Sequence, residues 1–326
     1  MTYASTELQI DDEPLVTVVI PAYNAESTLA ECLESVVGQR YRNLEIIVID
    51  DHSTDATTNI AQEYVEKDGR IHVLRKNNAG PGAARNDGLR LARGKYLQFV
   101  DADDVLDPAA ISTTVEIAER THADLVSFDF TLLSNGQIAS RSGAVPLAYP
   151  SIEQSSGVEC LRQIYLGHLG YFSWAFLYRL STVRSCKLHY PEDVHLLEDM
   201  FMLNQLLRHD LKVAYCEKHL YGYRKNTDSL SHTSGSERAL QGFQVVTAVE
   251  RMCETENLRI YARSAVSILL YLDSLLPLGS SKHKLLRAEA RHMASLGGVG
   301  KLNRHVILRL VLASTGAMDL LRKLKR

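Results

Sequence analysis

Short apolar runs alternate with amphipathic stretches along the first hundred residues of the chain. Four runs predict strands. Residues 16–20 and 45–49 are rich in valine and isoleucine and have the composition of buried strands, and residues 71–74 and 95–100 predict a short third strand and a fourth. Between them, apolar residues recur at helical spacing, which predicts helices over residues 25–37, from Thr54 or Asp55 to about Lys67, and over residues 83–93. Residues 21–24 and 77–82 are expected to be loops. The alternation predicts a doubly wound α/β domain with a mostly parallel sheet.

The pattern changes in the second half of the chain. Residues 124–130 predict another strand, residues 134–156 are polar and turn-rich, and residues 157–166 and 200–207 predict helices. From about Ser236 the pattern is helical, with amphipathic stretches over residues 240–257 and 258–275 followed by a break at Pro277. We therefore expect an N-terminal tail (1–14), an α/β domain (15–235) and a helical C-terminal region (236–326).

Polar residues follow three of the four strands. They are Tyr23 and Asn24, then Asp50 and Asp51, then the acidic turn formed by Asp101, Ala102, Asp103 and Asp104. In open α/β sheets, ligands bind outside the carboxyl ends of the strands. Clustered carboxylates repel one another unless a cation lies among them, and hard oxygen ligands suit Mg²⁺ or Mn²⁺. The alternative is a solvated turn after a strand, with Pro108 opening a helix.

Composition and charge remove several classes of protein. The 326 residues carry a formal net charge of -3 and are 45% hydrophobic, which is ordinary for a globular protein and unlike a general nucleic-acid binder. The five cysteines are widely spaced without a Cys-x-x-Cys pair, so neither a disulfide framework nor a zinc site is predicted. Residues 1–13 do not resemble a signal peptide, and no apolar run is long enough to span a bilayer. We expect a cytoplasmic protein.

Two common nucleotide-binding motifs are absent from the sequence. No Gly-x-Gly-x-x-Gly follows the first strand, and no Gly-Lys-Ser/Thr loop occurs anywhere, which removes the usual dehydrogenase and P-loop interpretations. The strand ends instead favour recognition of a nucleotide by carboxylates and a metal.

Four motifs in register resemble family 2 glycosyltransferases. Residues 18–24 read Val-Val-Ile-Pro-Ala-Tyr-Asn, residues 48–55 read Val-Ile-Asp-Asp-His-Ser-Thr-Asp, Asn78-Ala79-Gly80 precedes Ala-Arg-Asn-Asp-Gly at 84–88, and residues 100–104 read Val-Asp-Ala-Asp-Asp. The resemblance covers roughly residues 15 to 230. It implies a GT-A fold, the nucleotide-diphospho-sugar transferase fold, and a nucleotide-diphospho-sugar as donor substrate. His52 stands where the family often has glycine, and histidine tolerates left-handed turns better than most residues.

The resemblance also implies roles for the strand-end residues. Asp51 resembles the acid that binds the nucleotide base, although a helix N-terminal or Asx-turn acid is the alternative. Asp103 resembles the direct metal ligand and Asp101 the residue near ribose and metal, while Arg85 would contact the diphosphate or donor sugar unless it is a surface arginine. The remaining donor-binding residues implied are Pro21, Ala22, Tyr23, Asn24, Asn78 and Ala102.

Three further segments match the family in the second half. Asp199, in the Glu-Asp pair at 198–199, resembles the general base of an inverting displacement; the alternative is that both acids cap the following helix. Arg224 lies in the Tyr-x-Tyr-Arg segment and would pair with the diphosphate on loop closure, and His232 could ligate the metal or be solvated. Residues 173–179 lack the family's lysine, with Phe176 in its place, and Trp174 is expected in the core or in the wall of an acceptor pocket.

These residues predict a metal-dependent inverting glycosyltransferase that uses Mn²⁺ or Mg²⁺. It would move a sugar from a nucleotide-diphospho-sugar, with UDP-sugar favoured, to a glycan or lipid-linked glycan hydroxyl in surface polysaccharide or glycolipid assembly. The alternatives are a non-catalytic binding subunit and a sugar nucleotidyltransferase, whose Gly-rich first loop is absent. The basic amphipathic segment at 301–326 predicts either peripheral contact with the inner face of the plasma membrane or packing on its own domain or in a dimer.

Overall fold

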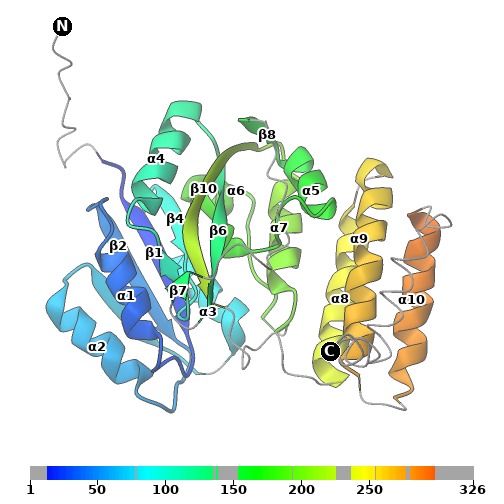
Figure 1. The fold of residues 1–326 in the computed structure, drawn as a ribbon, viewed down its shortest axis with the longest axis horizontal. Helices are drawn as coiled ribbons and strands as arrows, with labels where there is room; N and C mark the ends of the chain where they lie inside the picture. The colour runs from blue at the N-terminus through cyan, green and yellow to red at the C-terminus, as the bar shows by residue number, and fades with distance from the viewer. Residues whose placement is uncertain are drawn as a thin grey trace, which may run out of the picture.

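A central sheet organises most of the chain, and a group of three long helices lies beside it (Figure 1). The computed structural model describes residues 13–77, 79–134, 137–138, 153–192, 194–224, 236–253, 255–276 and 280–297. Asn78, His232 and residues 301–326, to which the sequence assigns functions, lie outside the described residues.

The first four long strands are parallel, in the order β3-β2-β1-β4. Their bounds are Val16–Ala22 for β1, Leu44–Asp50 for β2, Ile71–Arg75 for β3 and Tyr96–Phe99 for β4. All seven residues of β2 are buried, as are all but Pro21 in β1. The strands predicted from apolar runs are thus confirmed, because a strand covered on both faces needs a continuous apolar sequence.

The other half of the sheet is mixed, but its antiparallel pairs are short, so most of the paired residues in the whole sheet lie in parallel pairs, as expected. The order continues as β9 (Phe176–Arg179), β6 (Leu125–Ser134), β10 (Lys212–Arg224) and β5 (Val105–Leu106). Strand β9 is antiparallel to both β4 and β6, whereas β10 is parallel to β6. The chain returns to the carboxyl edge of the sheet before β9 begins. Strand β9 therefore starts at that edge and runs in the opposite direction to β4 and β6. Short strands β7 (Gln137–Ile138) and β8 (Gln154–Ser156) pair with β6 and β10.

Helices connect these strands, and α1 and α2 lie in front of the sheet as drawn in Figure 1. Their bounds are Leu29–Val37 for α1, Thr57–Lys67 for α2, Gly80–Leu91 for α3, Ala110–Thr121 for α4, Gly157–Tyr165 for α5, Leu180–Ser185 for α6 and Glu198–Leu207 for α7. A 3-10 turn over Ser173–Ala175 precedes β9. Helix α1 therefore begins four residues later than expected, and residues 25–28 form a turn ahead of it.

Two expected loops are partly regular structure. Pro21 and Ala22 belong to β1, where they pair with Ile49 and Asp50. Proline is tolerated there because the pairing of β1 with β4 ends two residues earlier, at Val19, so no ladder hydrogen bond is missing on that side. Helix α3 begins at Gly80, with proline in its first turn, where the missing N–H costs nothing.

The three C-terminal helices are α8 (Ser236–Met252), α9 (Thr255–Ser274) and α10 (Lys282–Leu296), drawn yellow to orange in Figure 1. Helix α8 ends at Met252 and α9 begins at Thr255, slightly earlier than the expected boundary between residues 257 and 258. Helix α8 packs on α7, and α9 packs on α5 and α10. Buried Asp273 of α9 bonds His283 and Arg287 of α10 at 2.7 and 3.0 Å.

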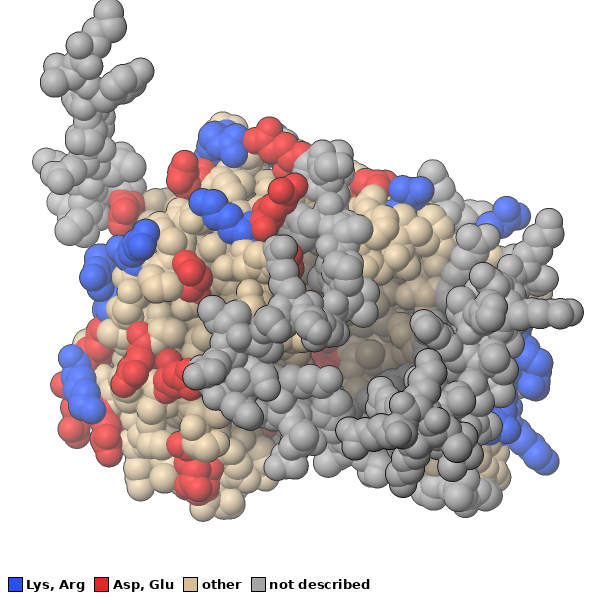
Figure 2. Space-filling view, viewed as in Figure 1, with Lys and Arg blue, Asp and Glu red and all other residues tan. Residues whose placement is uncertain are grey.

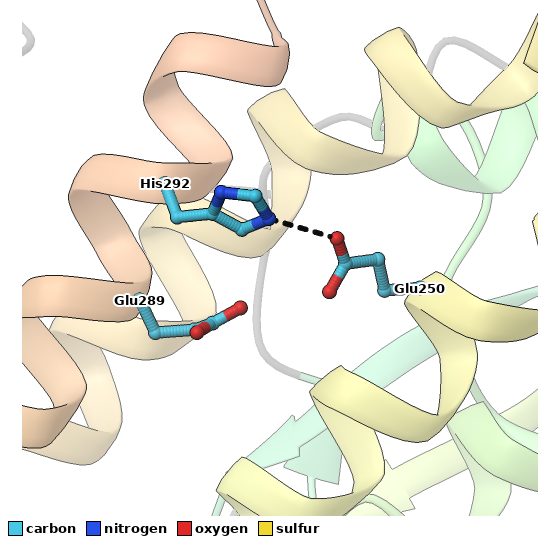
Figure 3. A group of neighbouring side chains, drawn as sticks. All are labelled: Glu250, Glu289 and His292. Atoms are coloured by element: carbon cyan, nitrogen blue, oxygen red, sulfur yellow. Dashed lines mark hydrogen bonds and ion pairs between the residues drawn. The ribbon is translucent and has the colours of Figure 1, made fainter.

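A second contact joins α10 to α8. His292 Nε2 lies 3.1 Å from a carboxylate oxygen of Glu250, and Glu289 points to the same place (Figure 3). The His292 side chain is half exposed, and its contact with Glu250 accounts for the arrangement as a surface link between helices. On the face drawn in Figure 2, acidic and basic side chains are interspersed over the described surface. None of the described helices has both the length and the apolar character that crossing a bilayer requires.

Candidate active site

The acidic turn after β4 lies at the carboxyl edge of the sheet. Asp101 and Asp103 are partly exposed, whereas Asp104 is fully buried and accepts hydrogen bonds from the Tyr221 hydroxyl at 2.8 Å and the Arg224 N–H at 2.6 Å. Burial, followed by the charges of Asp101 and Asp103, raises the pKa of Asp104 to about 9. The turn therefore concentrates carboxylate oxygens that a divalent cation would neutralise, and this donor set fits Mg²⁺ or Mn²⁺.

Arg85 of α3 lies among carboxylates from distant parts of the chain. Its side chain is only 5% exposed, and its guanidinium lies 2.8 Å from Asp101, 3.2 Å from Glu198 and 3.6 Å from Asp199. The interpretation of Arg85 as a surface arginine is therefore wrong. A buried arginine stabilises such acids through charge-assisted hydrogen bonds, so Arg85 joins the acidic turn to the first turn of α7.

Asp199 is held by Ser173 and Arg85. The Ser173 N–H and hydroxyl donate to its two carboxylate oxygens at 3.0 and 2.8 Å, and the Arg85 guanidinium lies 3.6 Å from the oxygen that accepts the hydroxyl. Burial raises the pKa of Asp199 to about 6, with Glu198 adding to the rise and Arg85 opposing it. The carboxylate is thus ionised at neutral pH and more basic than an ordinary aspartate, which suits a general base.

The alternative role for Glu198 and Asp199, as caps of α7, does not fit the geometry. The N-cap position is Leu197, in a left-handed conformation with a φ of 67°, and no side chain caps the helix. Both acids instead direct their carboxylates to Arg85, and Asp199 also to Ser173.

Asp51 holds the start of α3. It is 3% exposed, and its two carboxylate oxygens accept the N–H groups of Ala79 at 3.0 Å and Gly80 at 2.7 Å. This is the helix N-terminal role that the sequence left open for Asp51. Each oxygen retains a further lone pair, so the contact with a nucleotide base is compatible with it and stays a prediction.

Hydrogen bonds join the end of β1 to the turn after β2, so these two segments form one surface at the carboxyl edge of the sheet. The Ala22 carbonyl accepts the Asp51 N–H at 2.8 Å, and the side chain of Asn24, which has a φ of 48°, accepts the Thr54 N–H at 2.9 Å. Tyr23 is 44% exposed at this edge. His52 has a φ of 68°, which confirms that it adopts the left-handed conformation for which the family often uses glycine.

Arg224 ends β10 beside the acidic turn. Its Nε donates to the Asp103 carbonyl at 2.8 Å and one Nη to Glu31 at 2.6 Å. Trp174 is 2% exposed and stacks on Tyr221, with ring centroids 4.1 Å apart, so it lies in the core, which is one of the two places expected for it. Ala102 is also buried, at 7% exposure.

Sequence reasoning assigned no role in the site to Ser173 or Tyr221, and it assigned Glu198 only the alternative role of a helix cap. The Tyr221 hydroxyl contacts both the Asp104 carboxylate and the Asp101 N–H, the latter at 3.1 Å. Its position in the Tyr-x-Tyr-Arg segment was the available signal. No feature of the sequence pointed to Ser173, because its contact with Asp199 joins residues that are 26 positions apart.

Residues 17–178 match the family model described as glycosyl transferase family 2. The chain belongs to this family. It is 32% identical over 221 residues to the uncharacterized glycosyltransferase EpsJ of Bacillus subtilis, which is 67% of this chain and 63% of EpsJ. It is 30% identical over 237 residues to the glycosyltransferase GlyA of Streptococcus pneumoniae, which is 68% of this chain and 32% of GlyA. The chain thus spans less than two thirds of the length of these relatives.

Solved structures share the fold of this family 2 chain. Residues 1–349 of TarS from S. aureus, in complex with UDP-GlcNAc, superpose with a TM-score of 0.62 at 18% identity, covering 87% of this chain and 90% of that one. The mannosyltransferase PcManGT from Pyrobaculum calidifontis, in complex with GDP-Man and Mn²⁺, gives a TM-score of 0.58 at 16% identity, covering 96% and 88%. The chain has the GT-A fold expected from the sequence motifs.

Proposed function

We propose that this chain is a metal-dependent, inverting glycosyltransferase that moves a sugar from a nucleotide-diphospho-sugar, with UDP-sugar favoured, to an acceptor hydroxyl. The observation that carries the proposal is the position of Arg85, which bonds Asp101 of the acidic turn and lies 3.6 Å from Asp199. The donor-binding edge and a poised carboxylate base therefore form one site.

Asp51 and the residues from Pro21 to Asn24 would bind the nucleoside, together with Asn78 and Ala102. Asp103 and Asp101 would hold Mn²⁺ or Mg²⁺ on the diphosphate, and Arg224 would approach the same group. When bound, the ion supplies positive charge that stabilises the departing nucleoside diphosphate. The carboxylate oxygens of the acidic turn are the ligands that such an ion prefers.

Asp199 would perform the proton transfer. As the acceptor hydroxyl oxygen forms a bond to the anomeric carbon, the bond from that carbon to the diphosphate oxygen breaks, and Asp199 takes the hydroxyl proton. Ser173 and Arg85 hold the carboxylate, so little reorganisation is needed during the reaction. A single displacement inverts the configuration at the anomeric carbon.

Binding of the donor can be tested by thermal shift. The chain and Asp103→Ala are screened against UDP-, GDP-, CMP- and dTDP-linked sugars with Mn²⁺, Mg²⁺ or EDTA. A donor at a hundredfold excess over its Kd adds about 2.7 kcal/mol of stability. We expect stabilisation by UDP-sugars that disappears with EDTA and in the variant. If every donor fails to stabilise the wild type, the proposal is wrong.

The catalytic step has a separate test. Asp199→Asn should retain donor-induced stabilisation while the transfer rate falls by roughly 10²–10⁴-fold. An Asp199→Asn variant with the full transfer rate would contradict the assignment of the base.

The cellular setting proposed is assembly of surface polysaccharide or glycolipid at the inner face of the plasma membrane, with a glycan or lipid-linked glycan as acceptor. The polysaccharide setting rests on the family to which the chain belongs. Contact with the membrane rests on the basic residues of the segment 301–326, including Arg304, Arg309, Arg322, Lys323 and Arg326. A chain that ends near Gly300 should lose binding to vesicles containing anionic lipid. Unchanged binding would remove the membrane from the proposal.

A further inference from the structure

The four residues before α7, 194–197, form a segment that we call the α7 lead-in. It ends at Leu197, whose left-handed conformation directly precedes Glu198 and Asp199. A leucine is strained in this conformation, so contacts elsewhere must stabilise it. The lead-in therefore sets where α7 begins and where Asp199 lies.

Helix α8 binds the backbone of the lead-in. Arg238 donates to the His195 carbonyl at 2.8 Å, and the His195 N–H donates to the side-chain oxygen of Gln241 at 3.2 Å. Residues three apart lie on one face of a helix, so the two side chains reach the same peptide together. Both backbone groups of one lead-in residue are thus bonded by α8.

A packing contact supports these two bonds. Leu196 is 8% exposed, and its side chain approaches Gly242, where an added Cβ would lie 3.4 Å from it. The same added Cβ would lie 2.6 Å from a methyl group of Leu272 in α9. Glycine thus lets the lead-in and α9 approach the same part of α8.

The lead-in also contacts the start of α3, next to Asp51, the residue proposed to bind the nucleoside. The His195 ring lies against Gly80, where an added Cβ would come within 2.3 Å of its Nδ1. Gly80 donates its N–H to Asp51. The lead-in is therefore held between α8 and the start of α3, and it carries the candidate base at its end.

We propose that α8 is a positioning element for the transfer reaction, and that Arg238 and Gln241 fix the α7 lead-in so that Asp199 meets Arg85 and Ser173. Neither residue touches a reacting group, so both are positioning residues. They lie beyond residues 17–178, the part matched by the family model. The inference rests on the proposed function, because it needs Asp199 to act in transfer.

The test uses full-length chains and the donor found by thermal shift. Gln241→Leu and Arg238→Met each remove one bond to His195, whereas Gln241→Glu keeps an acceptor and Arg238→Lys keeps a donor. Arg251→Ala, at an exposed position of the same helix, is the matched control. We expect kcat to fall at least tenfold in the first pair with donor KM within about threefold, substantial recovery in the conservative pair, and no change in the control.

Three results would overturn the inference while leaving the proposed function intact. They are wild-type kcat in Gln241→Leu and Arg238→Met, a rise in donor KM as large as the fall in kcat, and conservative variants as slow as the first pair. If Gln241→Leu does not fold, Gln241→Ser opens the same bond without adding apolar surface and is judged by the same criteria. A wild-type chain without transfer would instead overturn the proposed function.

Discussion

At the scale of single residues, the site is defined by how charges are shared around Arg85. The residue types were readable from the sequence, since Asp101, Asp103 and Asp199 each stand in a motif. Their mutual contacts were not, because Arg85 and Glu198 are 113 positions apart and meet only through the fold. Asp51 shows the same limit: the sequence named the residue, and the structure shows its contacts with the first amides of α3.

The raised pKa of Asp199 predicts the pH dependence of transfer. A general base must be deprotonated, so with a pKa of about 6 the value of kcat/KM should rise roughly tenfold per pH unit below pH 6 and level off above it. The negative charge of Glu198 helps to raise the pKa of Asp199. Glu198→Gln should therefore lower that pKa and move the acid limb of the pH profile to lower pH. Steady-state rates between pH 4.5 and 8 measure both. An acid limb that stays in place in Glu198→Gln would assign it to another group.

Arg85 should matter for stability as well as activity. Removing it leaves Asp101, Glu198 and Asp199 partly buried without their shared cation, and breaking a buried ion pair costs about 3–5 kcal/mol. Urea unfolding of Arg85→Gln at pH 7 should show this loss. Arg90→Gln, in the same helix, is the control: Arg90 is 68% exposed in its pair with Asp87, so the change should stay within about 1 kcal/mol. Equal losses in the two variants would contradict the role given to Arg85.

At the scale of elements, apolar runs predicted the central strands well because burial on both faces leaves little freedom in composition. The misses have physical causes. The first turn of α3 reads as a loop because Gly80, Pro81 and Gly82 are poor helix formers, yet Asp51 bonds its free amides. Strand β10 escaped prediction because exposed Glu217 and Lys218 interrupt its apolar pattern where its register with β6 shifts.

The seating of α3 on β1 predicts a pairwise effect. A Cβ added at Gly88 would lie 2.2 Å from a methyl group of Val19, so Gly88→Ala should destabilise the fold by roughly 1–3 kcal/mol. Val19→Ala removes that methyl group, so Gly88→Ala should cost clearly less in the Val19→Ala background. A double-mutant cycle by urea unfolding measures the coupling. Gly69→Ala, where an added Cβ meets nothing within 4 Å, is the control, and additive effects at Gly88 and Val19 would refute the contact.

At the scale of the whole molecule, the sequence predicted where the helical region begins but not how it docks. Amphipathic stretches show that α8 and α9 have apolar faces, while the identity of the partner surface depends on the complete fold. In the structure, one buried cluster extends from Val16 of β1 to Met293 of α10. The proposed division near residue 235 therefore separates sequence regions whose cores are joined.

A shared core predicts that both parts unfold together. Trp174 is the chain's one tryptophan and lies in the sheet region, so its fluorescence reports there, whereas far-UV circular dichroism includes a large contribution from α8, α9 and α10. Urea transitions by the two probes should coincide. Asp273→Ala removes the carboxylate that contacts His283 and Arg287 within the helical region and should move both transitions to lower urea together. If only the dichroism transition moves, the helices form an independent unit, and α8 would be able to loosen without disturbing the site around Asp199.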